Sequence, residues 1–104
     1  METTAGRYQT FAEFYPFYLS EHADRTNRRL HFIGTTLVIL TAAWAVFSGH
    51  WNLMWLLPVF GYGFAWVGHF VVERNRPATF KYPLYSLRGD FVMYKDIWTG
   101  RIPF

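Results

Sequence analysis

The chain has 104 residues, of which 52% are apolar, 22% are aromatic and only 16% are charged. An ordinary soluble domain carries roughly 25% charged residues, so this composition favours a membrane protein, and the length allows a single domain over residues 1–104. The chain has no cysteine, which excludes disulfides, zinc–thiolate sites and cysteine nucleophiles. Its net charge of +3 does not indicate a nucleic-acid-binding protein, because the aromatic residues lie in apolar segments and not among the basic ones.

The first predicted element covers residues 10–23. Aromatic and apolar side chains recur there at helical spacing, namely Phe11, Phe14, Tyr15, Tyr18 and Leu19. We expect a short amphipathic helix that lies in the membrane interface.

Two membrane-spanning helices are predicted next, over residues 26–48 and 51–74. No Asp, Glu, Lys or Arg occurs from Leu30 to Val72, and this run of about 43 residues is long enough for two spans of roughly 20. Gly49 should end the first span, and we expect a kink near Pro58 in the second. The competing interpretation is a buried helical hairpin of a soluble protein.

The fourth predicted element is an amphipathic helix over residues 85–98. The predicted fold is therefore all-α: an integral membrane helical hairpin of two spanning helices, with flanking amphipathic or interfacial helices. Lys and Arg residues precede the first span and follow the second, whereas the connection between the spans has none. The positive-inside rule then places both termini in the cytoplasm, and a bacterial inner membrane is the expected location.

Two histidines should lie at the same depth in this hairpin. If His50 marks the tip, His31 precedes it by 19 residues and His69 follows it by 19, a rise of about 28 Å on each helix. Asn27 and Glu73 form a second matched pair, each 23 residues from the tip. Polar groups at this depth are costly and usually face inward for a functional reason.

His22 is a third candidate for the same site. Nine residues of continuous helix would place it on the opposite face from His31, so the chain must break between Asp24 and Thr26, either of which can cap the second helix. Three imidazoles with a nearby carboxylate could bind iron, zinc or copper, and the lack of thiolates favours non-haem Fe(II). The simpler interpretation is that each histidine only anchors a helix at the level of the lipid head groups.

A family resemblance covers these same residues, from about Phe11 to Trp98. The pattern His-x4-Asn-x3-His, followed by Gly-His-x3-Glu-x3-Pro, resembles the Mpo1-like membrane proteins. The resemblance implies a dioxygenase that needs Fe(II), uses dioxygen as co-substrate and shortens 2-hydroxy fatty acids by one carbon. The motif histidines fall on His22, His31 and His69 as metal ligands, with Asn27 and Glu73 beside them as catalytic residues.

Further expectations concern the substrate and the packing of the helices. Arg74 and Arg76 could bind the carboxylate of a lipid or fatty-acid substrate, and Gly34 and Gly68 could let the two spans approach closely. Two alternatives stay open: a haem-binding electron-transfer protein with two axial histidines, and a small membrane subunit without catalytic activity.

Overall fold

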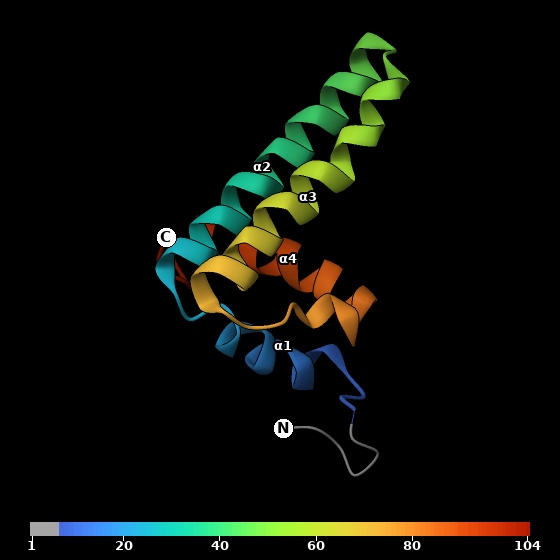
Figure 1. Ribbon diagram of the computed structural model, residues 1–104. Helices are drawn as coiled ribbons and strands as arrows, with labels where there is room; N and C mark the ends of the chain where they lie inside the picture. The colour runs from blue at the N-terminus through green and yellow to red at the C-terminus, as the bar shows by residue number, and fades with distance from the viewer. Residues whose placement is uncertain (1–6) are drawn as a thin grey trace.

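The computed structural model describes residues 7–104, and within that range every regular element is helical (Figure 1). This confirms the all-α prediction. In chain order the elements are α1 (Phe11–Ser20), α2 (Arg25–Ser48), the 3-10 helix η1 (Trp51–Trp55), α3 (Leu56–Trp66), the π-helix η2 (Val67–Glu73), the 3-10 helix η3 (Ala78–Phe80) and α4 (Pro83–Trp98).

A long hairpin dominates the molecule. Its first arm is α2, and its second arm is the continuous run of η1, α3 and η2 (Figure 1). The side chain of Asp24 caps α2 by accepting from the N–H of Thr26. Gly49 ends α2 with φ 74°, a left-handed conformation that glycine adopts without steric cost. Both ends of this arm therefore follow the sequence prediction.

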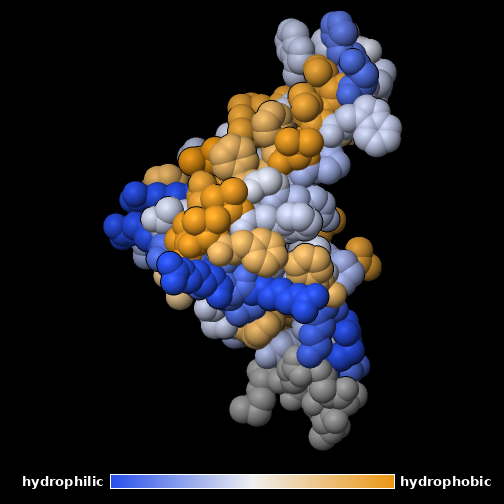
Figure 2. Space-filling model, viewed as in Figure 1, coloured by the Kyte–Doolittle hydropathy of each residue, from blue (hydrophilic) through white to orange (hydrophobic). Residues whose placement is uncertain are grey.

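The two arms have the length and composition of membrane spans. They contain 24 and 23 residues, and only 17% of the most apolar window of each is buried inside the protein. Large apolar side chains instead cover the outside of the hairpin, including Leu40, Trp44, Phe47, Trp55, Val59 and Val71. Figure 2 shows this apolar surface along the arms, with hydrophilic residues gathered at the tip and around the opposite end. The hairpin of a soluble protein would bury these side chains. Their exposure here favours the membrane interpretation.

The second arm changes helix type twice, and the kink expected near Pro58 stays a prediction. Regular α-helix starts at Leu56, so Pro58 lies in the first turn of α3, where its missing N–H is tolerated. The first change, from 3-10 helix to α-helix, falls at Leu56. The second falls at Val67, where the α-helix becomes a π-helix that runs to Glu73.

Below the hairpin, α1, η3 and α4 form a cap with an aromatic core. Its buried members are Tyr8, Phe14, Tyr18, Ala78, Tyr82, Met93 and Ile97. The hydroxyl of Tyr15 donates to Asp96 (2.7 Å) and that of Tyr18 donates to Asp90, so both hydrogen bonds tie α1 to α4. Helix α1 ends three residues earlier than the sequence predicted. Helix α4 starts two residues earlier than predicted, with Pro83 at its first position.

The arms of the hairpin pack closely at glycines, as predicted. A Cβ built on Gly34 would lie 2.9 Å from the carbonyl oxygen of Phe60 and 3.0 Å from the Cβ of Phe64. By contrast, a Cβ on Gly63 would meet no heavy atom within 4 Å among the described residues. The first glycine is a packing requirement and the second is not.

We therefore expect Gly34→Ala to destabilise the protein by about 1–3 kcal/mol, because the added methyl group pushes the arms apart. Gly63→Ala is the matched control and should be neutral or slightly stabilising, since alanine is the better helix former. Thermal unfolding in detergent measures both. Equal stability of the two variants would contradict the close approach at Gly34.

Candidate metal centre

Three histidines from separate elements meet where the hairpin joins the cap. His22 lies in the turn after α1, His31 on the first arm and His69 in the π-helix of the second. Their ring centroids are 4.4, 4.5 and 4.9 Å apart, and one ring nitrogen of each lies within 4.8 Å of the others. All three are buried, with exposed fractions of 1%, 5% and 3%. The predicted chain break does fall between α1 and α2, and it brings His22 back to the pair.

The outward nitrogens of two rings are committed to backbone carbonyl groups. Nδ1 of His22 donates to the carbonyl oxygen of Tyr18 (2.6 Å), and Nδ1 of His31 donates to that of Asn27 (3.0 Å). A carbonyl oxygen can only accept, so each Nδ1 carries the proton. Each Nε2 of a neutral ring therefore presents its lone pair to the centre.

His69 is oriented in the same way by a side chain. Its Nδ1 donates to Oδ1 of Asn75 (2.7 Å), while Nδ2 of Asn75 donates to the carbonyl oxygen of Glu21 (3.0 Å). The second bond fixes which end of the amide faces the imidazole. Asn75 reaches this position because Arg74 adopts a left-handed conformation (φ 57°) and ends the π-helix, after which the Asn75 N–H donates to the His69 carbonyl (2.8 Å). Helical periodicity ends at this turn, so the sequence prediction missed Asn75.

This arrangement calls for a cation between the rings. The Nε2 atoms of His22 and His31 are 3.1 Å apart, and two facing lone pairs at this distance repel each other. Protonation is a poor solution, because burial and the repulsion from His31 and His69 hold the pKa of His22 well below its usual range. A metal ion fits better: imidazole–zinc bonds are about 2.0–2.1 Å, so one ion can contact both nitrogens. The outward hydrogen bonds are those that metal-binding histidines typically make.

The predicted pair Asn27 and Glu73 is in contact, as the matched depth indicated, but the pair lies next to the three-histidine cluster and is not part of it. Nδ2 of Asn27 lies 3.4 Å from Oε1 of Glu73, which also accepts from the N–H of Asp24 (2.6 Å) at the start of α2. A carboxylate there stabilises the positive end of the helix. A Cβ on Gly68 would lie 1.8 Å from Oδ1 of Asn27, so the absence of a side chain at Gly68 lets the arms come together here.

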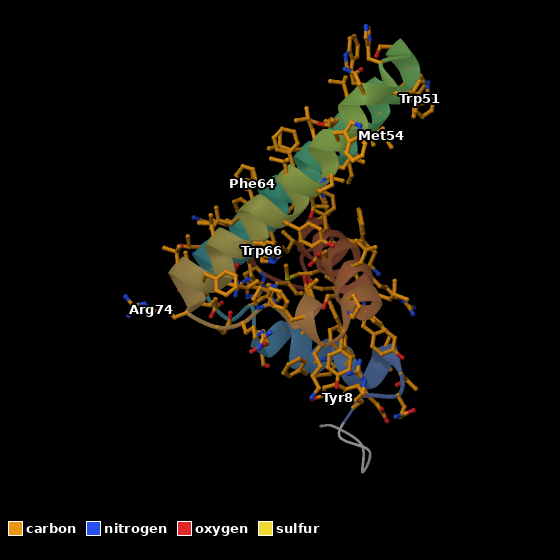
Figure 3. The ribbon with its side chains drawn as sticks, turned by 45° about the vertical axis from the view of Figure 1, so that its right-hand side comes forward. Tyr8, Trp51, Met54, Phe64, Trp66 and Arg74 are labelled. Atoms are coloured by element: carbon orange, nitrogen blue, oxygen red, sulfur yellow. The ribbon has the colours of Figure 1, made fainter. Side chains whose placement is uncertain are left out.

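The two predicted substrate-binding arginines are exposed. The guanidinium of Arg76 lies over the ring of Phe80 at 4.8 Å, and Arg74 lies at the outer edge of the hairpin (Figure 3). Neither lines the cavity at the histidines, so their role stays a prediction. His50 is exposed at the far tip, where its Nδ1 lies 2.8 Å from Ser48 Oγ, as the sequence indicated.

A small cavity of about 20 Å³ adjoins the histidines. It has room for about one water molecule, far too little for a porphyrin, which weighs against the haem alternative. Tyr18 and Asp90 lie in its wall: the Tyr18 ring stacks on His22 with centroids 4.1 Å apart, and its hydroxyl donates to Asp90. Burial raises the pKa of Asp90 to about 6.

Fold and site together define a helical protein with two potential membrane spans and a buried three-histidine centre suited to a metal ion. A family model described as "2-hydroxy-palmitic acid dioxygenase Mpo1-like" matches residues 8–102. The chain therefore belongs to the Mpo1-like family, as the sequence motifs predicted. Neither the curated proteins nor the solved structures contain a match to the chain.

Asn75→Ala should weaken metal binding by about 10–100-fold, the usual loss when a hydrogen-bond partner of a metal-bound histidine is removed. Asn52→Ala, at the exposed tip of the hairpin, is the control and should bind as the wild type does. Competition with a chelator of known affinity measures both. An unchanged affinity in Asn75→Ala would contradict the orienting role.

The metal-free protein should lose stability as the pH falls below 6.5, the ordinary pKa of histidine. The unfolded chain takes up a proton there, whereas folded His22, with its lowered pKa, does not, so acid favours unfolding. His22→Phe cannot titrate and should show a smaller pH dependence. Thermal unfolding across this pH range is the measurement. Stability that rises on acidification would contradict the lowered pKa of His22.

Proposed function

We propose that the protein is an Fe(II)-dependent membrane dioxygenase that shortens 2-hydroxy fatty acids by one carbon. The observation that carries the proposal is that one ring nitrogen from each of His22, His31 and His69 lies within 4.8 Å of the others in one buried place. Family membership supplies the class of reaction and of substrate. Iron is the metal we assign, because imidazole ligands suit it and dioxygen chemistry needs a redox-active ion.

Bound Fe(II) would supply a redox centre with coordination positions that three histidines leave open for substrate and dioxygen. The chain itself would hold that centre rigid and nearly dry. Tyr18, Asn27 and Asn75 fix the three imidazoles through Nδ1, and the small cavity leaves little room for water. Cleavage of the C1–C2 bond, with dioxygen as the oxidant, would then release C1 as carbon dioxide, form one water and leave C2 as the carboxyl carbon of the shorter acid.

The surroundings of the centre suit a substrate with a polar head and an apolar tail. We propose that the hairpin spans the membrane with both termini in the cytoplasm, since the basic residues flank the arms at the histidine end. The centre then lies at the cytoplasmic edge of the bilayer, where a carboxylate stays near water while the chain stays in lipid. Arg74 and Arg76 would attract that carboxylate along the surface.

Asn27 and Glu73 enter the proposal as positioning residues. Their contacts join the start of α2 to the end of the π-helix, and these two elements carry His31 and His69. Loss of either side chain should therefore loosen the geometry between the arms.

The test is anaerobic purification in detergent, followed by metal analysis, an optical spectrum and an assay with 2-hydroxy fatty acids. Stoichiometric iron without a Soret band, and conversion to the acid one carbon shorter, are expected. The same fatty acid without its 2-hydroxyl group should not react. His31→Ala and His69→Ala should abolish both iron binding and turnover, because each removes a ligand.

His50→Ala is the matched control, since this histidine lies at the far tip, and it should retain iron and activity. Turnover that survives loss of both His31 and His69 would refute the proposal. A Soret band would establish haem instead. A protein that binds no metal even when Fe(II) is supplied, and that does not turn over fatty acids, would favour the non-catalytic membrane subunit.

A further inference from the structure

A second, larger cavity adjoins the histidine centre. It has a volume of about 280 Å³ and lies between α2, α3 and α4. His31, Tyr62 and Asp90 line this cavity and also the small one at the histidines. The two cavities therefore meet at His31.

The larger cavity is an apolar groove that leads away from the centre. Apart from the three shared residues, its walls consist of Thr35, Val38, Leu57, Pro58, Gly61, Leu87 and Phe91. On α2 the lining residues run from His31 to Val38, which is about 10 Å of helix. The polar groups Asp90 and His31 thus lie at the inner end, and the far end lies within the apolar part of the hairpin.

The wall formed by α4 shows how a ligand could enter the groove from the side. Leu87 and Phe91 of α4 are 54% and 44% exposed, and Leu84 on the same helix is 79% exposed. These residues extend the apolar surface of the hairpin on to the cap. A hydrocarbon chain could pass from lipid into the groove along these apolar side chains.

We propose that this groove binds the acyl chain of the substrate and sets the chain length that the enzyme accepts. The proposal rests on the proposed function, because the 2-hydroxy carboxylate must then lie at the His31 end. Lipid tails are as apolar as the groove, so the groove adds little affinity. Its effect is to hold the chain in one direction, so that C1 and C2 stay at the centre.

Two glycines on α3 allow a matched test. Gly61 lines the groove, and a Cβ there would lie 3.6 Å from Cγ2 of Val38, an ordinary contact. Gly63, two residues on, is exposed and lies outside the groove lining. Gly61→Leu should fill the groove, while Gly63→Leu adds the same side chain to the outer surface.

We expect Gly61→Leu to shift the preferred substrate toward shorter 2-hydroxy acids, with turnover of the longest lowered at least ten-fold. Gly63→Leu should keep the wild-type profile, and both variants should keep wild-type iron content. Leu57→Trp, at the far end of the groove, is a second variant should Gly61→Leu fold poorly. A wild-type profile in Gly61→Leu or Leu57→Trp, with an active wild-type enzyme, would overturn the groove and leave the proposed function standing.

A binding measurement can support the groove even if the proposed reaction fails. A 2-hydroxy fatty acid with a diazirine at its tail end should cross-link to Val38, Leu57 or Pro58, and the unlabelled acid should compete. Cross-links confined to outward residues such as Ile39 and Val59, which are 42% and 60% exposed, would refute the groove. Competable cross-links in the groove of a protein without turnover would support the groove while the proposed reaction fails.

Discussion

The repulsion between imidazole lone pairs is the constraint on which the rest of the structure depends. Nε2 of His22 and Nε2 of His31 lie 3.1 Å apart in a buried place, and His69 completes the cluster. Hydrogen bonds at the opposite nitrogens keep the rings from turning away. The fold therefore holds a cluster that is unfavourable alone and favourable around a cation, which is how a metal site can couple its ion to the stability of the folded chain.

The cap has a buried core, whereas the hairpin buries little of its own surface. That core is aromatic and is enclosed by α1 and α4. Gly89 lets the ring of Tyr18 approach α4, since a Cβ there would lie 3.0 Å from that ring. The Tyr18 ring in turn stacks on His22, and the backbone carbonyl oxygen of Tyr18 accepts a hydrogen bond from Nδ1 of His22. Packing in the cap thus determines where the third histidine stands.

The two adjoining cavities differ in polarity. The small cavity has the imidazoles, Tyr18 and Asp90 in its wall, and the larger one is lined mainly by aliphatic and aromatic side chains. Because the basic residues flank the arms at the same end of the hairpin as the histidines, this division coincides with the proposed boundary between water and lipid. The proposed amphiphilic substrate would match this division without having to leave the membrane.

Helical spacing in the sequence by itself determined the hairpin and two of the three histidines of the centre. An uncharged run long enough for two helices identifies two potential spans without tertiary information, and equal helical rise from one tip predicts His31 and His69 at one depth. His22 was predicted as a ligand only through the family motif, because the capping residues allow a break in the chain but do not determine the direction it takes afterwards. Tertiary structure alone decided the position of Asn75, which lies beyond a left-handed turn, and the groove, whose third wall depends on how the aromatic cap seats α4 against the hairpin. Such contacts join residues far apart in the chain, and local periodicity carries no information about them.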